Sequence, residues 1–540
     1  MRRIVIFVVL IFTTLSAWGQ VLYDLVVYGG TPAGVAAAIQ AKRMQLKVVL
    51  LEPGDHLGGM LVEGLGGSDI DNHAEFQNSP AVGGIALEFY RRIAKVYRRE
   101  AAFEEMISNR LKKPELWRFE SKVAEKVIRE WIAELGMDVR YRNALDEREG
   151  AVEKVGNQIR SIRTVDGEVF NAKQFIDGTV EGDLLAAAGI SYVVGRESNH
   201  RYGETRNGIR EETTHAQFKV KVDPYRIEGD ASSGLIATVQ DEPLGKPGSG
   251  DKRIQAYCFR MCLTQDDSNK IPFTKPASYN RDDYVIYLRY LKVGGKLYTP
   301  NKKLPNGKTD LGAWHDLSHN LYGMNHAYPE ATYAERRAIL KQHRNFTQGL
   351  FYFFAHDPEV KELAPQFQQE WASWGLAKDE FTDNEGWPRM FYVRDGRRMV
   401  SDYVITEHHL RKDHPLPVED PVAVAYWPPD VHSVRRIVKN GRVYNEGFVF
   451  GGDFWRPLPI SYRALVPRQE ECQNLITPTC PSSSHIGYGA IRLEWTFMAL
   501  GQAAATAAAI AIDTGSSVQE VNYDVIRKIL VRNGQVLAIE

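Results

Sequence analysis

The sequence predicts an α/β fold that opens with a strand, a glycine turn, a helix and a second strand. Residues 23–28 form a short apolar run, which is typical of a buried parallel strand. The stretch at 35–42 is rich in alanine and helical in character, and 47–51 is a second apolar strand that ends at Glu52. In a Rossmann-like domain the turn and the helix N-terminus face a pyrophosphate, and an acid about 20 residues further on binds a ribose.

The turn matches the dinucleotide fingerprint G-x-G-x-x-G imperfectly. Gly29 and Gly34 hold the first and last positions, whereas Thr31 replaces the middle glycine. An imperfect glycine pattern is weak evidence on its own, because glycine turns also serve packing. The preceding strand, the following helix and Glu52 together favour a dinucleotide site over an ordinary strand–helix turn.

Length and composition fit a globular protein of two or more domains. The chain has 540 residues, of which 44% are hydrophobic and 25% are charged, and its formal net charge is −1. It contains no polybasic block. Nucleic acid and anionic membrane surfaces are therefore not expected as partners.

The N-terminus has the pattern of a secretory signal peptide. Arg2 and Arg3 precede a short apolar run at 4–12, and 17–19 supplies small residues before a cleavage site at Gln20. The run is short for a membrane span, although an uncleaved anchor is the alternative. We expect removal of residues 1–19, a periplasmic or secreted protein, and no stable membrane span after cleavage.

Four cysteines follow, at positions 258, 262, 472 and 480. An exported protein can form disulfides, but Cys258 and Cys262 would be too far apart to bridge if they lie in one strand. Their spacing also lacks the paired C-x-x-C of a zinc site. Buried free thiols and no metal centre are the expectation.

The pattern divides the rest of the chain into three parts. Residues 20–198 continue the nucleotide-binding pattern. Residues 199–465 alternate strand-like stretches with loops rich in Pro, Asn, Asp and Gly, and predict an inserted α+β substrate domain. Residues 466–540 contain a small-residue loop at 480–490 and an alanine-rich helix at 491–512, and we expect them to fold back onto the first part. Further helices are expected from apolar spacing at 81–104, 122–135, 331–357 and 361–374.

Several segments resemble FAD-dependent oxidoreductases of the glutathione-reductase-like superfamily. The resemblance rests on GGTPAG with Glu52, HLGG at 56–59 and FIDGTVEGDLLAAAG at 175–189. Longer segments, including 391–404 and 482–504, are similar to a bacterial family of FAD-dependent oxidoreductases. Members of that family are often exported and often occur in organisms that degrade polysaccharides. The resemblance covers nearly the whole chain after residue 19.

This resemblance implies a glutathione-reductase-type FAD-binding domain and its cofactor contacts. The acid is expected to bind the adenosine ribose, and the glycine turn to line the pyrophosphate. The segment before the last helix would bring backbone N–H groups and the positive end of that helix to the flavin, where they favour the negative charge of the reduced ring. The expected FAD-binding residues are Gly29, Gly30, Thr31, Ala33, Gly34, Glu52, Gly58, Gly59, Met60, Asp177, Gly178, Thr179, Ser484, Gly487 and Gly489.

Three residues are candidates for catalysis beside the flavin. His485 is the first choice for a general base, because hydride transfer from an alcohol needs a group that removes the hydroxyl proton. His432, which Asp430 can orient, is the second. Arg492 falls in the first turn of the predicted last helix, where a cation needs an acceptor, either a functional partner or Glu494. A histidine bonded to backbone is the structural alternative for either imidazole.

The residues and the resemblance together predict an exported FAD-dependent oxidoreductase that oxidises a hydroxyl group of a carbohydrate or related metabolite. Tryptophans such as Trp314, Trp427 and Trp455 would stack on sugar rings, or else form core. One alternative is a redox-neutral lyase that cleaves a glycoside by transient oxidation and elimination. Another is a non-catalytic carbohydrate-binding protein on the same scaffold. The expected partner is a small molecule, a sugar or glycoside, and the sequence does not indicate the electron acceptor.

Overall fold

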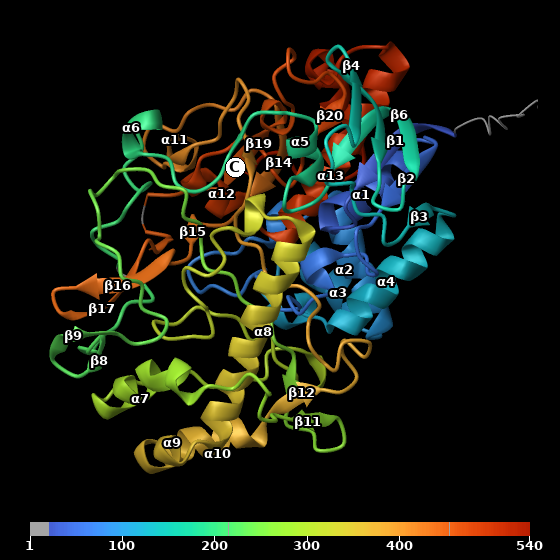
Figure 1. Cartoon of the computed structure of the whole chain (residues 1–540). Helices are drawn as coiled ribbons and strands as arrows, with labels where there is room; N and C mark the ends of the chain where they lie inside the picture. Colours follow the sequence, from blue (N-terminus) through green and yellow to red (C-terminus); the bar gives the residue numbers. More distant parts are fainter. Residues whose placement is uncertain (1–20, 214, 453, 540) are drawn as a thin grey trace, which may run out of the picture.

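The computed structural model describes residues 21–213, 215–452 and 454–539, and the predicted signal peptide lies outside them. A mixed sheet carries the predicted nucleotide turn (Figure 1). Its strand order is β3-β2-β1-β6-β5-β4, with β20 also paired to β6, and β1 runs parallel to both β2 and β6. The predicted α/β class is confirmed. The strands of this sheet are β1 Leu22–Tyr28, β2 Val48–Leu51, β3 Asp138–Arg140, β4 Val152–Val155, β5 Gln158–Arg163, β6 Val169–Asp177 and β20 Leu475–Ile476.

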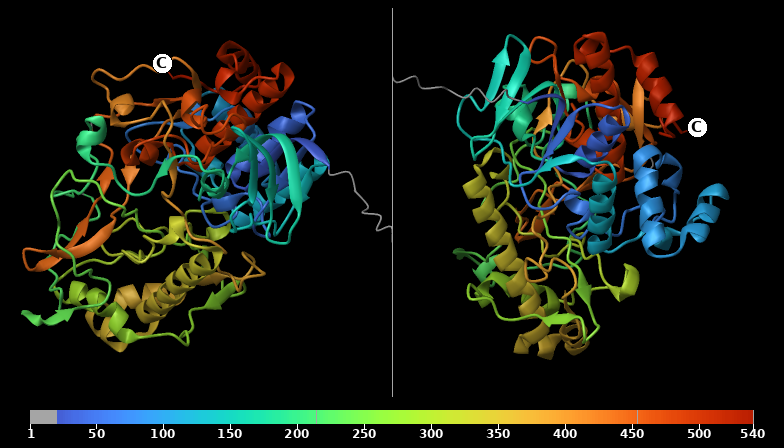
Figure 2. Two further views of the ribbon diagram at one scale, coloured as in Figure 1. Left: turned by 45° about the horizontal axis from the view of Figure 1, so that its top comes forward. Right: turned by 90° about the vertical axis from the view of Figure 1, so that its right-hand side faces the viewer.

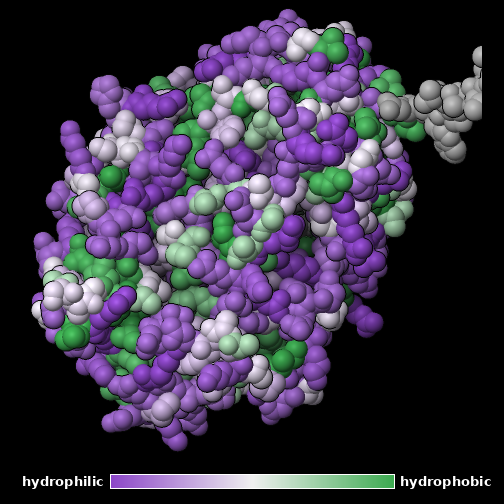
Figure 3. Space-filling model, in the orientation of Figure 1, coloured by the Kyte–Doolittle hydropathy of each residue, from purple (hydrophilic) through white to green (hydrophobic). Residues whose placement is uncertain are grey.

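Two alanine-rich helices, α1 Pro32–Arg43 and α13 Glu494–Thr514, pack against each other beside this sheet. Gly501 permits the close approach, because a Cβ there would lie 2.0 Å from the carbonyl oxygen of Ala33. Among the described residues, α13 is the helix long and apolar enough to cross a membrane, and 94% of its apolar stretch is buried inside the protein. Hydrophilic residues cover most of the face seen in Figure 3. Because its apolar stretch is buried inside the protein, we describe α13 as a core helix.

A second core, rich in aromatic rings, lies between α7 Val285–Lys292, α8 Tyr333–His356 and α10 Pro365–Ser373. A capping box of Thr332 and Glu335 starts α8. The ring of Trp371 lies 5.0 Å from that of Phe354, centroid to centroid. Figure 2 shows α8 running from the sheet to the opposite end of the molecule. At the sheet end, the hydroxyl of Tyr333 lies 3.2 Å from that of Tyr28.

The remaining elements are mostly short. The helices are α2 Gly84–Val96, α3 Glu100–Ser108, α4 Ser121–Glu134, α5 Asp183–Ala187, α6 Asn199–Tyr202, α9 Pro358–Leu363, α11 Glu407–Leu410, α12 His485–Ile491 and α14 Tyr523–Arg532. The strands are β7 Tyr192–Val193, β8 Tyr225–Ile227, β9 Asp230–Leu235, β10 Leu263–Thr264, β11 Lys270–Pro272, β12 Gly375–Ala377, β13 Arg398–Met399, β14 Pro421–Ala425, β15 Asp430–Val431, β16 Arg435–Lys439, β17 Arg442–Glu446, β18 Val449–Phe450 and β19 Leu458–Ser461.

Three predicted elements differ from the structure. The helix expected at 81–104 is divided into α2 and α3, because Arg98 adopts a φ of +55° between them. The helix expected at 361–374 is divided at Pro365, since a proline cannot donate to the preceding turn. The loop expected at 480–490 contains most of α12, and α13 starts only at Glu494. Arg492 therefore lies between two helices and not in a first turn.

Hydrophobic packing groups the segments differently from the predicted domain boundaries. The second core draws its residues from Phe218 to Val393, together with Val443. Side chains from Ile405 to Val466, including those of β14 and β19, join the first core around α13. Much of the segment expected in the substrate domain thus packs against the nucleotide-binding part. The boundaries at 199 and 465 stay predictions.

Candidate active site

The glycine turn after β1 packs against the start of α1 and against Thr179 so closely that side chains would not fit between them. Gly29 has a φ of +97°, and a Cβ there would lie 2.6 Å from Cγ2 of Thr179. A Cβ on Gly34 would lie 1.8 Å from the carbonyl oxygen of Gly29. A cavity of about 160 Å³ opens at this turn, and its lining includes Gly29, Gly30 and Thr179. The bare backbone of the turn is what close approach to a pyrophosphate requires.

Thr31 explains how the fingerprint tolerates a residue other than glycine at its middle position. It is the N-cap of α1 with a φ of −66°, a conformation open to any L-residue. Its hydroxyl oxygen accepts from the backbone N–H of Gly34 at 3.4 Å and donates to the carbonyl oxygen of Gly178. Thr31 also lines the cavity. The threonine adds a helix cap and a hydrogen bond to the residue that follows β6, without closing the site.

Glu52 lines the same cavity from the end of β2. Its carboxylate accepts from the backbone N–H groups of Gly30 at 2.7 Å and Gly54 at 2.6 Å. Burial raises the pKa of Glu52 to about 7, and the two backbone donors offset this only in part. A ribose that donated its hydroxyls to this carboxylate would favour the ionised form.

The other residues expected at the cofactor take different places around the turn. Gly59 and Thr179 line the cavity, whereas Met60 packs with Leu65 and Tyr392. Asp177 accepts from Thr179 and from the backbone of α5, so it anchors the wall from behind. Three further members hold the wall of the cavity. The backbone of Ala33 packs closely against Gly501 of α13. The backbone N–H groups of Gly58 and Gly178 donate to the carbonyl oxygens of Gly30 and Tyr28, respectively.

Buried acids hold the start of α12. Ser484 is its N-cap, and the Ser484 hydroxyl accepts from the N–H of Gly487 at 3.1 Å while donating to Glu204 at 2.6 Å. The backbone N–H of His485 donates to Glu197 at 3.0 Å. Gly487 and Gly489 let the helix lie close to its neighbours, because a Cβ on Gly487 would lie 2.6 Å from the carbonyl oxygen of Ile405 and one on Gly489 would lie 2.9 Å from Cγ2 of Val431. These contacts explain why a segment rich in Ser and Gly is helical here.

His485 faces a buried carboxylate. Its Nδ1 lies 3.1 Å from Oδ2 of Asp395, within ion-pair distance although not aligned as a hydrogen bond. In the part of the chain that the structure describes, Nε2 of His485 has no hydrogen-bond partner. Asp395 also accepts from the backbone and side chain of Gln255, at 3.2 Å each, and Gln255 Oε1 accepts from the N–H of His432. One buried network therefore joins the imidazole of His485 to the backbone of His432.

Arg492 pairs with Asp430 and not with Glu494. Its Nη2 lies 2.9 Å from Oδ2 of Asp430, and its Nη1 donates to the Tyr392 hydroxyl at 2.9 Å. His432 Nε2 lies 3.5 Å from Oδ1 of the same aspartate. Burial, followed by the nearby charges of Arg394 and Arg492, lowers the pKa of His432 well below its ordinary value. Among the three candidates, His432 and Arg492 thus share one partner.

Unpaired polar atoms gather around this network. Within the described ranges, no hydrogen-bond partner reaches His485 Nε2, Arg394 Nε, Asp430 Oδ1 or Glu494 Oε2, all of them buried. Burying a polar atom without a partner costs about 1–3 kcal/mol. Their grouping, together with the glycine turn, fits a cofactor and substrate that supply the missing polar partners.

Sequence reasoning did not identify Asp395 and Cys258 as part of this region. Asp395 lies in the run RDGRR, which is dominated by arginines. Nothing in the neighbouring sequence indicates that this acid is fully buried. Cys258 accepts a hydrogen bond from Nη2 of Arg394 at 3.1 Å. Burial raises the pKa of this thiol, but Arg394 and His319 more than offset it, and the pKa falls to about 6. All four cysteines are free and buried.

A cluster of acidic residues outside this network has the spacing of a metal site. Ligand oxygens of Glu120, Asp379 and Glu380 lie within 4.8 Å of one another. The ammonium of Lys308 lies 2.7 Å from each of the three carboxylates. The lysine thus supplies the positive charge that an ion would otherwise bring.

Comparison with known proteins identifies the class. The fold is of the α/β class expected for a flavin-dependent oxidoreductase, and the family model described as FAD dependent oxidoreductase matches residues 24–530. The chain therefore belongs to this family, which confirms the predicted enzyme class and FAD as its cofactor. When bound, FAD supplies the acceptor for the electrons of the substrate. No curated protein sequence matches the chain.

Solved structures match shorter stretches of the chain. Bacillithiol disulfide reductase Bdr from Staphylococcus aureus is 16% identical with a TM-score of 0.19, covering 30% of this chain and 38% of its own. Thioredoxin reductase from Streptococcus pyogenes is 18% identical with a TM-score of 0.17, covering 29% and 34%. A flavin monooxygenase from Stenotrophomonas maltophilia is 14% identical with a TM-score of 0.18, covering 29% and 37%. The chain thus spans less than half the length of these proteins.

Proposed function

We propose that this protein is an exported enzyme that oxidises a hydroxyl group of a carbohydrate or a related metabolite, with FAD as hydride acceptor. The observation that carries the proposal is the imidazole of His485, held beside Asp395 with Nε2 unpartnered among the described residues. An alcohol that becomes a carbonyl must release a hydride from carbon and a proton from oxygen. The free nitrogen of an oriented imidazole is suited to take that proton.

The charges around the two imidazoles favour His485 as the base. Asp395 is the carboxylate that would stabilise an imidazolium at His485, as in other carboxylate–histidine pairs. His432 instead lies near Arg394 and Arg492, and burial together with these charges lowers its pKa and disfavours a proton on its ring. We assign the hydroxyl proton to Nε2 of His485, and charge balance near the reduced cofactor to Arg492.

A group of aromatic residues beside His432 supports a sugar as substrate. We call it the aromatic rim: Trp314, Trp427, Phe448 and Phe450. The ring of Trp314, 39% exposed, lies 5.7 Å from that of His432, centroid to centroid. A cavity of about 530 Å³ reaches Trp314 from the surface. Flat aromatic faces next to polar groups are a common lining of small-molecule sites.

Anaerobic reduction of the flavin tests this proposal. Purified holoenzyme is mixed without oxygen with a panel of neutral sugars, glycosides, sugar acids and simple polyols, and the flavin absorbance is followed. We expect bleaching by at least one sugar or glycoside. A flavin that a chemical reductant bleaches but that no member of the panel reduces would exclude the proposed substrate class.

A second candidate function is the redox-neutral cleavage of a glycoside, which the presence of His432 favours. Once a carbonyl has formed, the neighbouring C–H is acidic, and a second base would remove its proton while the leaving group departs. The hydride taken in the first step would then return to the carbonyl carbon, so that the whole reaction involves no net oxidation. The low pKa of His432 keeps it unprotonated at neutral pH. Release of an aglycone without any electron acceptor, and with the flavin oxidised at the end, would distinguish this reaction from net oxidation.

Export is the part of the proposal that rests on residues 1–19 alone. N-terminal sequencing of the protein recovered from the periplasm or the medium is the direct test. A mature chain that begins at Gln20 would support it, and a full-length cytoplasmic protein would contradict it.

A further inference from the structure

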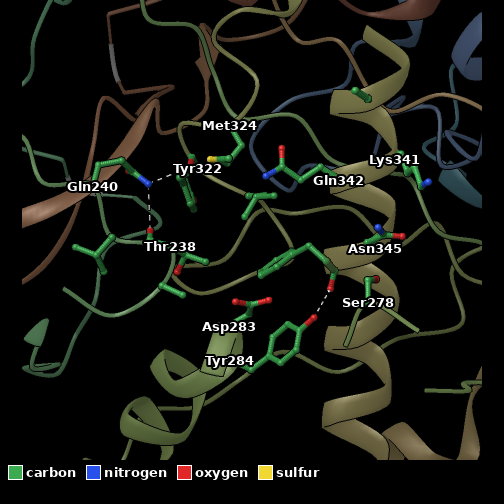
Figure 4. Close-up of a pocket in the computed structure, with 15 residues that line it drawn as sticks. Thr238, Gln240, Ser278, Asp283, Tyr284, Tyr322, Met324, Lys341, Gln342 and Asn345 are labelled. Carbon is green, nitrogen blue, oxygen red and sulfur yellow. Dashed lines mark hydrogen bonds between the residues drawn. The ribbon is translucent and has the colours of Figure 1, made fainter. Parts of the chain in front are cut away.

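A second cleft, separate from the nucleotide turn, lies against α8. Its volume is about 640 Å³, within the usual range of small-molecule sites. α8 forms one wall, and segments at 237–240 and 321–324 form the other (Figure 4). None of the residues that line it also lines the cavity at Gly29 or the one at Trp314. The proposed catalytic site does not use it.

The α8 wall presents amide groups that are free to bind. Gln342 and Asn345 are three residues apart, so they share a face of the helix. Neither side chain has a hydrogen-bond partner in the described parts of the chain, and the hydroxyl of Ser278, which also lines the cleft, has none either. In Figure 4, Gln342 extends from α8 toward Tyr322 and Met324. An amide both donates and accepts, as a hydroxyl does, so these groups match the hydroxyls of a sugar.

The opposite wall is held rigid. Gln240 donates to the carbonyl oxygen of Tyr322 at 3.0 Å and accepts from the backbone N–H of Arg436 at 2.7 Å. The guanidinium of Arg436 lies 4.5 Å from the centroid of the Tyr322 ring. Tyr284 donates to the carbonyl oxygen of Phe346 at 3.1 Å, a bond drawn in Figure 4. Tyrosine and phenylalanine rings thus line a preformed cleft, which reduces the entropy cost of binding.

The charges in the cleft balance. Lys341 and Asp283 are the charged side chains among its lining residues. An anionic ligand would therefore meet as much repulsion as attraction, unlike a phosphate or carboxylate site, which gathers cations.

We propose that this cleft is a non-catalytic binding site for a neutral polyhydroxylated ligand, specifically a short oligosaccharide. Free amides, a free hydroxyl, aromatic rings and the absence of net charge carry the proposal. It goes beyond the proposed oxidation, because it needs neither the flavin nor His485. Such a site would hold a glycan chain on the enzyme while another part reacts.

Calorimetric titration of the FAD-loaded protein with neutral oligosaccharides of two to five units tests the proposal. The disruptive variants are the double substitution Gln342→Ala with Asn345→Ala, and Ala338→Trp, which fills the cleft from an exposed position on α8. The matched control is Gln369→Ala, an exposed amide on α10 outside the cleft. We expect each cleft variant to weaken binding at least about tenfold, with the control unchanged.

The outcomes are distinguishable from those of the proposed function. If the cleft variants abolish oligosaccharide binding and no sugar reduces the flavin, the binding site is supported and the proposed oxidation is excluded. If sugars reduce the flavin but both cleft variants bind oligosaccharides as tightly as wild type, the binding site is overturned and the proposed oxidation is retained. Tighter binding of a sugar phosphate than of the neutral sugar would also overturn the site, since it contradicts the charge balance.

Discussion

Nδ1 of His485, at the start of α12, lies 3.1 Å from Oδ2 of Asp395, which belongs to a distant irregular segment. Burial raises the pKa of Asp395, but His485, Arg398 and Gln255 together more than offset this, and the pKa lies below its ordinary value. The carboxylate is therefore ionised at neutral pH. An ionised acid on one side of the ring directs the other nitrogen, Nε2, toward whatever proton donor enters the site.

Replacement of His485 should separate chemistry from cofactor binding. His485→Ala is expected to keep its FAD, because the ring does not line the cavity at the nucleotide turn. Removal of a general base typically slows the reaction about 10²–10⁴-fold. Stopped-flow reduction of the flavin by the active sugar, with FAD content measured on the same samples, makes the comparison. His200→Ala, an exposed histidine on α6, is the control. A rate within about threefold of wild type would move the search to His432.

Loss of the Glu52 carboxylate should weaken FAD binding. A carboxylate that accepts from ribose hydroxyls makes charge-assisted hydrogen bonds, each worth about 1.5–3 kcal/mol. Glu52→Ala should therefore lower FAD affinity at least about tenfold while the protein stays folded. Fluorescence titration of the apoprotein with FAD measures this. Asp55→Ala removes an exposed acid of the same loop and should leave affinity unchanged. Equal affinity in the two variants would contradict the role of Glu52.

Local sequence patterns predicted the nucleotide-binding part, because each of its signals is short-range. An apolar strand, a turn and an alanine helix each occupy fewer than about fifteen residues, and β1, α1 and β2 formed near their expected positions. The acid at the end of β2 followed from the same spacing. Even the imperfect glycine fingerprint kept its geometry, since Thr31 needs no left-handed backbone.

The catalytic region was harder to predict, because long-range packing decides its partners. The composition of 480–490 disfavours a helix, yet Ser484, Glu197 and Glu204 cap α12, and its glycines fit neighbouring backbone. The partner of Arg492 could not be read from the sequence, where Glu494 is the nearest acid. Asp430 reaches the guanidinium because β15 packs on α12. No spacing rule connects Asp395 with His485.

FAD affinity should depend on pH through Glu52. In the apoprotein burial raises its pKa to about 7, and donation from ribose hydroxyls would favour the ionised form. Binding should therefore strengthen as pH rises, with an affinity about tenfold lower at pH 6 than at pH 8. The raised pKa also stabilises the apoprotein below its unfolded value of 4.5, and this contribution is lost as pH rises through about 7. Glu52→Gln should flatten both curves, and a wild-type affinity independent of pH would contradict the assignment.

Lys308 should be essential to stability. Burial lowers its pKa, but the surrounding carboxylates more than offset this and keep it charged. Lys308→Met would leave buried acids without a counter-charge, and breaking such a network costs about 3–5 kcal/mol. Denaturant unfolding measures the loss. Lys126→Met removes an exposed lysine paired with Glu130, so it should cost no more than about 1 kcal/mol. Similar stabilities for the two variants would show that the acids are neutral or rearrange.

Cys258 should be a thiolate at neutral pH, and Cys262 a thiol. Arg394 and His319 offset the burial of Cys258 and lower its pKa to about 6, whereas burial raises that of Cys262 well above its ordinary value. The depressed pKa contributes stability above the unfolded value of 9.0, and this contribution is lost as pH falls through about 6. Thiolate absorbance of the apoprotein should grow as pH rises through that value. Cys258→Ser should abolish the step, and Cys262→Ser, the matched control, should keep it. A wild-type titration that begins only near the ordinary thiol pKa would show that Arg394 does not hold the sulfur ionised.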